Sequence, residues 1–213
     1  MLWAAGRFCA PVLAPFLAQK SAHLVLKEKQ RMSMQKKQTD YDKSTAKMFL
    51  DPYKYVIEVH IENIQKPENT VEIKKEYITG LETILVRQDI STASSIFPLI
   101  AKCVGLLDVP GLEEDVCVML GHISQNVEPV ARELVRCQVL SRCMELYRKR
   151  PEAVNKMLFL LTVINNTVKD LRSALEASGQ DPAALKCISA TDEHMSEKSK
   201  ERLCDILSSL NVK

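Results

Sequence analysis

Arginine and amide side chains in the second half of the chain have the spacing of a surface that binds another protein. Arg132 and Arg136 are four residues apart and share one face of a helix, and Arg142 follows them. Guanidinium groups pair with carboxylates and phosphates, so the three arginines indicate a basic surface for an acidic or phosphate-bearing partner. Gln125 and Asn166 stand near predicted helix ends, where an amide can donate to and accept from a partner's backbone.

The same cations have an alternative role within the chain. Glu133 and Glu145 are interspersed among them, so ion pairs between neighbouring side chains are expected as well. Arg148–Arg150 stand at the end of a predicted helix, where positive charge complements the helix dipole.

No spacing of residues predicts a catalytic, cofactor or metal site. The sequence has no glycine-rich phosphate loop, no dinucleotide fingerprint, no nucleophile elbow and no zinc-protease motif. Cys117 and His122 are separated by about 140° around a helix axis and cannot easily form a thiolate–imidazole pair. Cys137 and Cys143 flank a helix junction and could approach each other, but no further ligand stands at zinc spacing. We therefore expect no enzyme, no cofactor and no metal.

Composition favours a helical protein that does not coat nucleic acid. The 213 residues are 46% hydrophobic and only 5% aromatic, with 6 glycines, a balance more typical of helices than of β-sandwiches. The net charge of +2 is too small for a nucleic-acid-binding surface over the whole chain. The 7 cysteines are odd in number and mostly lie among apolar residues, which favours reduced thiols and a cytoplasmic location.

An apolar triplet recurs at about forty residues and predicts the elements that position these side chains. Its members stand at i, i+4 and i+7, which is one face of an α-helix. Equal helices at this period are typical of stacked helical repeats of the HEAT or armadillo type. The second and third triplets predict that Leu120, Ile123, Leu161 and Ile164 are buried between repeats. The four triplets are Tyr77/Leu81/Ile84, Val116/Leu120/Ile123, Met157/Leu161/Ile164 and Leu203/Leu207/Leu210.

Helix boundaries follow from capping residues and prolines. Tyr53–Ile64 alternates like a strand but also fits a helix, and we predict a helix because nothing downstream offers a partner strand. Asn69 with Glu72 predicts a capping box that starts the next helix. A short element over Ser91–Ile96 is expected to stop before Pro98, which opens a new helix.

The resulting layout of two short helices and a longer third resembles the armadillo repeat over roughly residues 70–213. The third helix of that family usually ends in a Leu-Ser-Asn-like sequence, and the matching tripeptides are Ile123-Ser124-Gln125 and Ile164-Asn165-Asn166. The resemblance implies a right-handed α-solenoid of about three repeats. It also implies that Asn166 occupies the position of the asparagine that contacts an extended ligand. The family's aromatic position is taken by Gly121 and Thr162.

The N-terminal segment has a different composition from the repeats. No acidic residue occurs before Glu28, which is compatible with a mitochondrial presequence, a secretory signal or an unstructured leader without a targeting role. Residues 28–47 are polar and lack apolar periodicity, so we expect 1–47 to be a disordered basic leader and linker and 48–213 to be the repeat domain. No apolar run reaches the length of a membrane span.

Together these patterns predict a non-enzymatic adaptor that binds another protein in the groove of its third helices. The alternative is a mitochondrial assembly or accessory factor, directed by a presequence within residues 1–31.

Overall fold

The computed structural model describes residues 52–86, 93–125, 127–188 and 192–211, and these contain helices and turns without a β-strand. The chain divides into one unit over residues 1–56 and a second over residues 57–213. Of the first unit only the start of one helix is described. The predicted leader and linker, residues 1–47, lie outside the described residues. The expectation of an all-α protein is confirmed for the described part of the chain.

The first two described helices are α3 (Pro52–Gln65) and α4 (Val71–Val86). The helix predicted over Tyr53–Ile64 is therefore confirmed. The predicted cap of α4 is wrong by one residue, because the backbone N–H of Ile73 donates to Thr70 Oγ1 at 3.4 Å. Asn69 instead donates to the carbonyl oxygen of Asn63 at 2.8 Å and so satisfies the end of α3.

Pro98 does not open a helix as predicted but lies inside α5 (Ala93–Gly105). A proline there removes one backbone hydrogen bond. The helix continues through it while Leu99, Ile100 and Cys103 are buried, so packing outweighs the local preference. Of the short element expected over residues 91–96, only the part from Ala93 is described, and it belongs to this same helix.

The later helices lie close to their predicted positions. Gly111 has φ +82°, a left-handed conformation that favours glycine, and α6 begins two residues later, at Glu113. The elements are η2 (Leu106–Asp108), α6 (Glu113–Ser124), α7 (Glu128–Arg136), α8 (Val139–Lys149), η3 (Pro151–Ala153), α9 (Val154–Thr167), α10 (Leu171–Ala177), η4 (Pro182–Cys187) and α11 (Glu197–Ser209).

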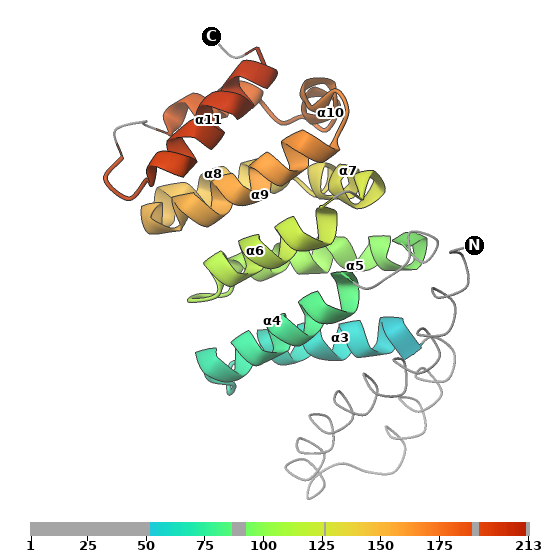
Figure 1. The fold of residues 1–213 in the computed structure, drawn as a ribbon. Helices are drawn as coiled ribbons and strands as arrows, with labels where there is room; N and C mark the ends of the chain where they lie inside the picture. The colour runs from blue at the N-terminus through green and yellow to red at the C-terminus, as the bar shows by residue number, and fades with distance from the viewer. Residues whose placement is uncertain (1–51, 87–92, 126, 189–191, 212–213) are drawn as a thin grey trace, which may run out of the picture. The chain divides into compact units, whose positions relative to one another are not determined.

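Within the second unit, four helices pack side by side in chain order. Helix α4 contacts α6, α6 contacts α9, and α9 contacts α11, and Figure 1 shows them in one row. Behind this row α5 packs against α7 and α7 against α10. Helices separated by about forty residues of sequence are therefore neighbours in space.

The recurring apolar triplets form much of the core between these helices. Leu120, Ile123, Leu161 and Ile164 are all buried, as their spacing predicts. The last triplet departs from the pattern, since Leu207 is only half-buried and the adjacent Ile206 is buried in its place.

A buried amide ties α7 and α8 to the loop after α10. Gln180 is 3% exposed, and its Oε1 accepts from the backbone N–H of Leu140 at 2.9 Å. Its Nε2 donates to the carbonyl oxygen of Val135 at 2.7 Å. One side chain thus satisfies the last turn of α7 and the first turn of α8, whose own N-cap residue, Gln138, supplies no side-chain cap.

Candidate functional site

Four side chains from the four helices of the row form a continuous line of contacts. Glu82 of α4 meets His122 of α6, with Oε1 and Nδ1 2.7 Å apart. The His122 ring meets the ring of Phe159 on α9 edge-on, at 5.6 Å between centroids and 78° between planes. The guanidinium carbon of Arg202 on α11 lies 5.4 Å from the centroid of Phe159. We call these four residues the ladder.

Gly121 makes the middle of the ladder possible. A Cβ atom at this position would lie 2.6 Å from the ring of Phe159, closer than real Cβ contacts allow. The absence of a side chain on α6 therefore lets the aromatic ring of α9 lie against the α6 backbone. The space beside Gly121 is thus filled by a side chain of the neighbouring helix.

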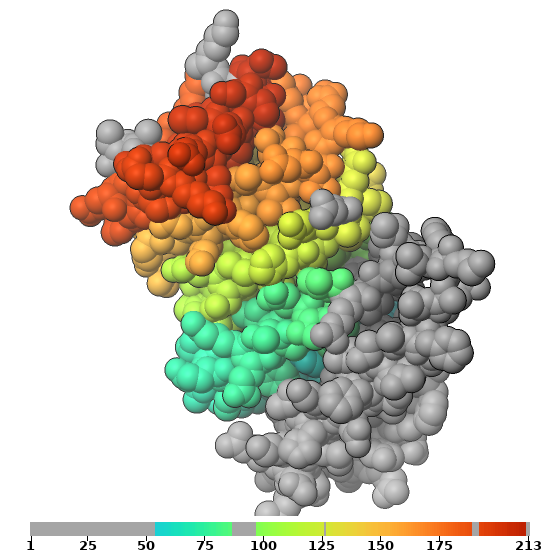
Figure 2. Space-filling view, viewed as in Figure 1, coloured from blue at the N-terminus to red at the C-terminus, as the bar shows by residue number. Residues whose placement is uncertain are grey.

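The ladder lies on the surface rather than in the core. The side chains of Glu82 and His122 are 30% and 40% exposed, and Phe159 and Arg202 are half-buried. Figure 2 shows α4, α6, α9 and α11 together on one side of the second unit. The outward side of these four helices is called the ladder face below.

The two predicted amide residues belong to the ladder face by helical register. Gln125 follows His122 by three residues, and Asn166 follows Phe159 by seven, so each shares a side of its helix with a ladder residue. Both amides are exposed. An ion pair between Lys75 and Asp115, at 3.1 Å, joins α4 and α6 at the other end of these helices.

The predicted basic surface is neutralised by acidic neighbours. Arg132 pairs with Glu128 at 2.7 Å, and this arginine lowers the pKa of the Glu128 carboxyl chiefly through the hydrogen bond. Arg136 pairs with Glu133 at 3.3 Å. Of the acids that the sequence suggests as partners, Glu133 pairs with Arg136, whereas Arg132 pairs with Glu128 instead.

Arg142 is not part of the same cluster. Its Nη1 lies 2.9 Å from Oδ2 of Asp108 in η2. Arg132 and Arg136 instead border two open hollows of about 360 and 370 Å³, which lie along α7. The structure thus brings two of the three predicted arginines together and directs the third elsewhere.

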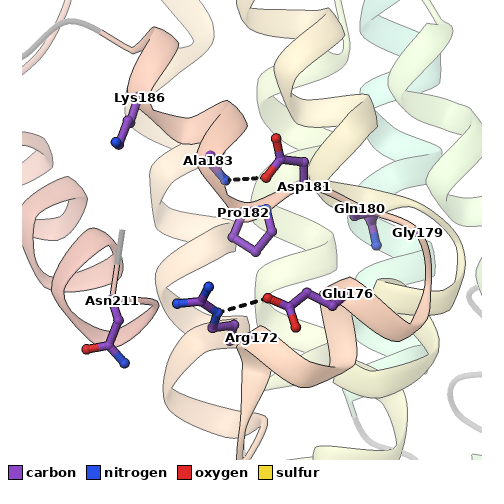
Figure 3. A pocket seen from close by; sticks show the side chains of 9 residues that line it. All are labelled: Arg172, Glu176, Gly179, Gln180, Asp181, Pro182, Ala183, Lys186 and Asn211. Carbon is purple, nitrogen blue, oxygen red and sulfur yellow. Dashed lines mark hydrogen bonds and ion pairs between the residues drawn. The ribbon is translucent and has the colours of Figure 1, made fainter. Parts of the chain in front are cut away.

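A larger open pocket of about 480 Å³ lies between α10, η4 and the end of α11 (Figure 3). Arg172 points to Glu176, with Nε and Oε1 2.9 Å apart, and also donates to the carbonyl oxygen of Leu210 at 2.9 Å. Asp181 accepts from the backbone N–H of Ala183 at 2.9 Å and caps η4. These contacts hold the loop after α10 in place and account for the polar lining.

The cysteines of the core are structural thiols. Cys117 is buried and His122 is half-exposed, so the two point to different sides of α6, as predicted. Cys143 has its thiol beside that of Cys117 rather than beside Cys137, and this contact and burial raise its pKa. Burial raises the pKa of Cys103 to about 12. No group of metal-ligating side chains occurs among the described residues.

Comparison with known proteins gives no family for the chain: no family model matches it, and its sequence matches no curated protein. None of the described helices is both long and apolar enough to cross a membrane.

Proposed function

We propose that the second unit is a short α-solenoid of armadillo-like repeats. The support comes from side-chain bonds that join segments of the chain about forty residues apart. These bonds repeat along the unit, as expected when each repeat contacts only its neighbours. They join Lys75 to Asp115 and Gln138 to Ser178, each 40 residues apart, Asn155 to the His194 carbonyl, 39 apart, and Arg172 to the Leu210 carbonyl, 38 apart.

On this scaffold the function is that of a non-enzymatic adaptor which binds another protein on the ladder face. The observation that carries the proposal is the exposed line from Glu82 through His122 and Phe159 to Arg202 across four helices. Aromatic and arginine side chains dominate the energetics of protein interfaces. Gln125 and Asn166 flank the ladder and supply donors and acceptors for a partner's backbone.

The test is partner recovery from cell extract with two matched double variants of the full chain. Gln125→Ala with Asn166→Ala changes the ladder face, whereas Glu145→Ala with Lys149→Ala changes exposed positions of α8. Both should leave the thermal midpoint within a degree or two, because the four side chains are exposed and Gln125 caps α6 through its backbone N–H rather than its side chain. Loss of a reproducible partner with the first variant alone supports the proposal. Equal recovery with both variants excludes the ladder face.

A second candidate is a mitochondrial assembly or accessory factor with the same scaffold. It rests on the sequence before Glu28, which contains no acidic residue. N-terminal sequencing of the protein purified from cells separates the two candidates. Cleavage within residues 15–45 favours the mitochondrial candidate, and an intact Met1 favours the cytoplasmic adaptor.

A further inference from the structure

Arg202 is held on the ladder face without an acidic partner. Its guanidinium carbon lies over the ring of Phe159, 5.4 Å from the ring centroid, and no acid among the described residues forms an ion pair with it. The N–H groups at the edge of the guanidinium donate to no described residue and are therefore available to a ligand. Those edge donors are the groups that bind a carboxylate in a bidentate manner.

Charge on the ladder face is compensated at one end and uncompensated at the other. On α4 and α6, the carboxylate of Glu82 contacts His122, and that of Asp115 forms an ion pair with Lys75. Helix α9 contains no acidic residue. The cation beside Phe159 is therefore Arg202, and no described acid pairs with it.

Helix α11 carries further exposed charges of both signs near Arg202. Lys198 stands one turn before Arg202, is exposed and has no ion-pair partner among the described residues. Asp205 is the acid that follows Arg202 by three residues and is also exposed. Asp205 therefore provides a control of opposite charge on the same helix.

We propose that the ladder face binds a protein segment carrying an Asp or Glu side chain next to an apolar side chain. The carboxylate binds the edge of Arg202, and the apolar side chain packs on the exposed part of Phe159. Gln125 and Asn166 contact the backbone of the same segment further along the face. This inference rests on the proposed adaptor function and specifies the chemistry of its partner.

The first experiment selects short random peptides on the full-length chain by phage display. Selected peptides should be enriched in Asp or Glu beside a leucine or phenylalanine. One such peptide is then labelled with a fluorophore, and its affinity is compared with that of a copy in which Gln replaces Glu. The carboxamide copy should bind about tenfold more weakly, as expected for loss of a charge-assisted bidentate contact.

Three variants of one helix identify the group that binds the carboxylate. Arg202→Gln should lower the affinity of the Glu peptide about tenfold and leave that of the Gln copy unchanged. Arg202→Lys should also lower it, because lysine keeps the charge but lacks the planar fork. Asp205→Asn should leave the affinity equal or slightly raise it, since it removes a negative charge from the same surface.

Three outcomes contradict the inference, and only one of them also excludes the adaptor proposal. Peptides without acidic enrichment that still lose binding with Gln125→Ala and Asn166→Ala leave the adaptor proposal standing and exclude the carboxylate. Peptides that bind every variant equally exclude the ladder face and therefore both proposals. Equal binding to Arg202→Lys and the unmodified chain excludes the bidentate contact.

Discussion

At the residue scale, the buried side chain of Gln180 joins two helices through hydrogen bonds to their backbone. Its amide accepts from Leu140 and donates to Val135, and both contacts are buried. We expect Gln180→Ala to lower the free energy of unfolding by about 1–3 kcal/mol, the usual cost of leaving buried polar groups unsatisfied. Denaturant unfolding measures it, with the exposed Gln125→Ala as the control that should change stability by less than about 0.5 kcal/mol. Equal effects of the two variants would show that the network contributes nothing net.

The thiols give a second prediction at the same scale. Cys103 is buried with a pKa of about 12, and Cys143 is buried with a raised pKa, so both are protonated near pH 8. Cys187 and Cys204 are exposed. Iodoacetamide should therefore modify the exposed pair first in the folded protein, because the thiolate is the reacting form and must be reached by solvent. Peptide mass spectrometry over a time course checks this, and in denaturant all four should react at similar rates.

At the element scale, the contact between α6 and α9 depends on one missing side chain. Gly121→Ala puts a Cβ atom against the ring of Phe159, so the helices must shift or the ring must leave its site. We expect a loss of about 1–3 kcal/mol in the free energy of unfolding. Gly105→Ala is the matched control, because the last residue of α5 has φ −60° and nothing within 4 Å of its Cβ position. That variant should be neutral or up to about 1 kcal/mol more stable.

A double variant confirms the cause of the Gly121 effect. Phe159→Leu should recover part of the loss in the Gly121→Ala background, since residues in contact are energetically coupled. Additive effects of the two substitutions would place the strain at another contact of α6.

The helices could be predicted from the sequence because their signals are local. Apolar residues at i, i+4 and i+7 placed α4, α6 and α9, and the same pattern predicted that Leu161 and Ile164 are buried. The errors occur where tertiary packing competes with a local rule. Pro98 is accommodated inside α5 because that helix buries Leu99 and Ile100.

Only part of the candidate site could be predicted from the sequence. Gln125 and Asn166 follow from the repeat, and they lie on the ladder face. The ladder itself joins Glu82, His122, Phe159 and Arg202 from four helices, and no local pattern pairs residues some forty positions apart. One usable signal is Gly121, because a glycine within a helix leaves room for a side chain of a neighbouring helix. The spacing of the arginines predicts a basic surface, but it does not show that Arg132 pairs with Glu128 and Arg142 with Asp108.

At the scale of the whole second unit, the helices pack in chain order, so the stability of each helix depends mainly on the helices that pack against it. The apolar core around Leu161 is lined by side chains of α7, α8, α9, α10 and α11, and by Leu210, which follows α11. Helix α9 also packs against α6. Helix α4 packs against α6, and it has no comparable contact with α9. A defect in α9 should therefore reach its neighbours directly and α4 only through α6.

Leu161→Ala tests this directional coupling. We expect a loss of about 2–5 kcal/mol, the range for emptying a packed leucine site. Hydrogen exchange under native conditions should show earlier opening of amides in α9, α10 and α11, with a smaller change in α4, because local opening follows the contacts that remain. The exposed Asn166→Ala on the same helix is the control and should leave exchange in α4 and α11 unchanged. An equal loss of protection from α4 to α11 would instead indicate one all-or-none core, and the solenoid proposal would then lose its energetic basis, because stacked repeats transmit a defect mainly to their neighbours.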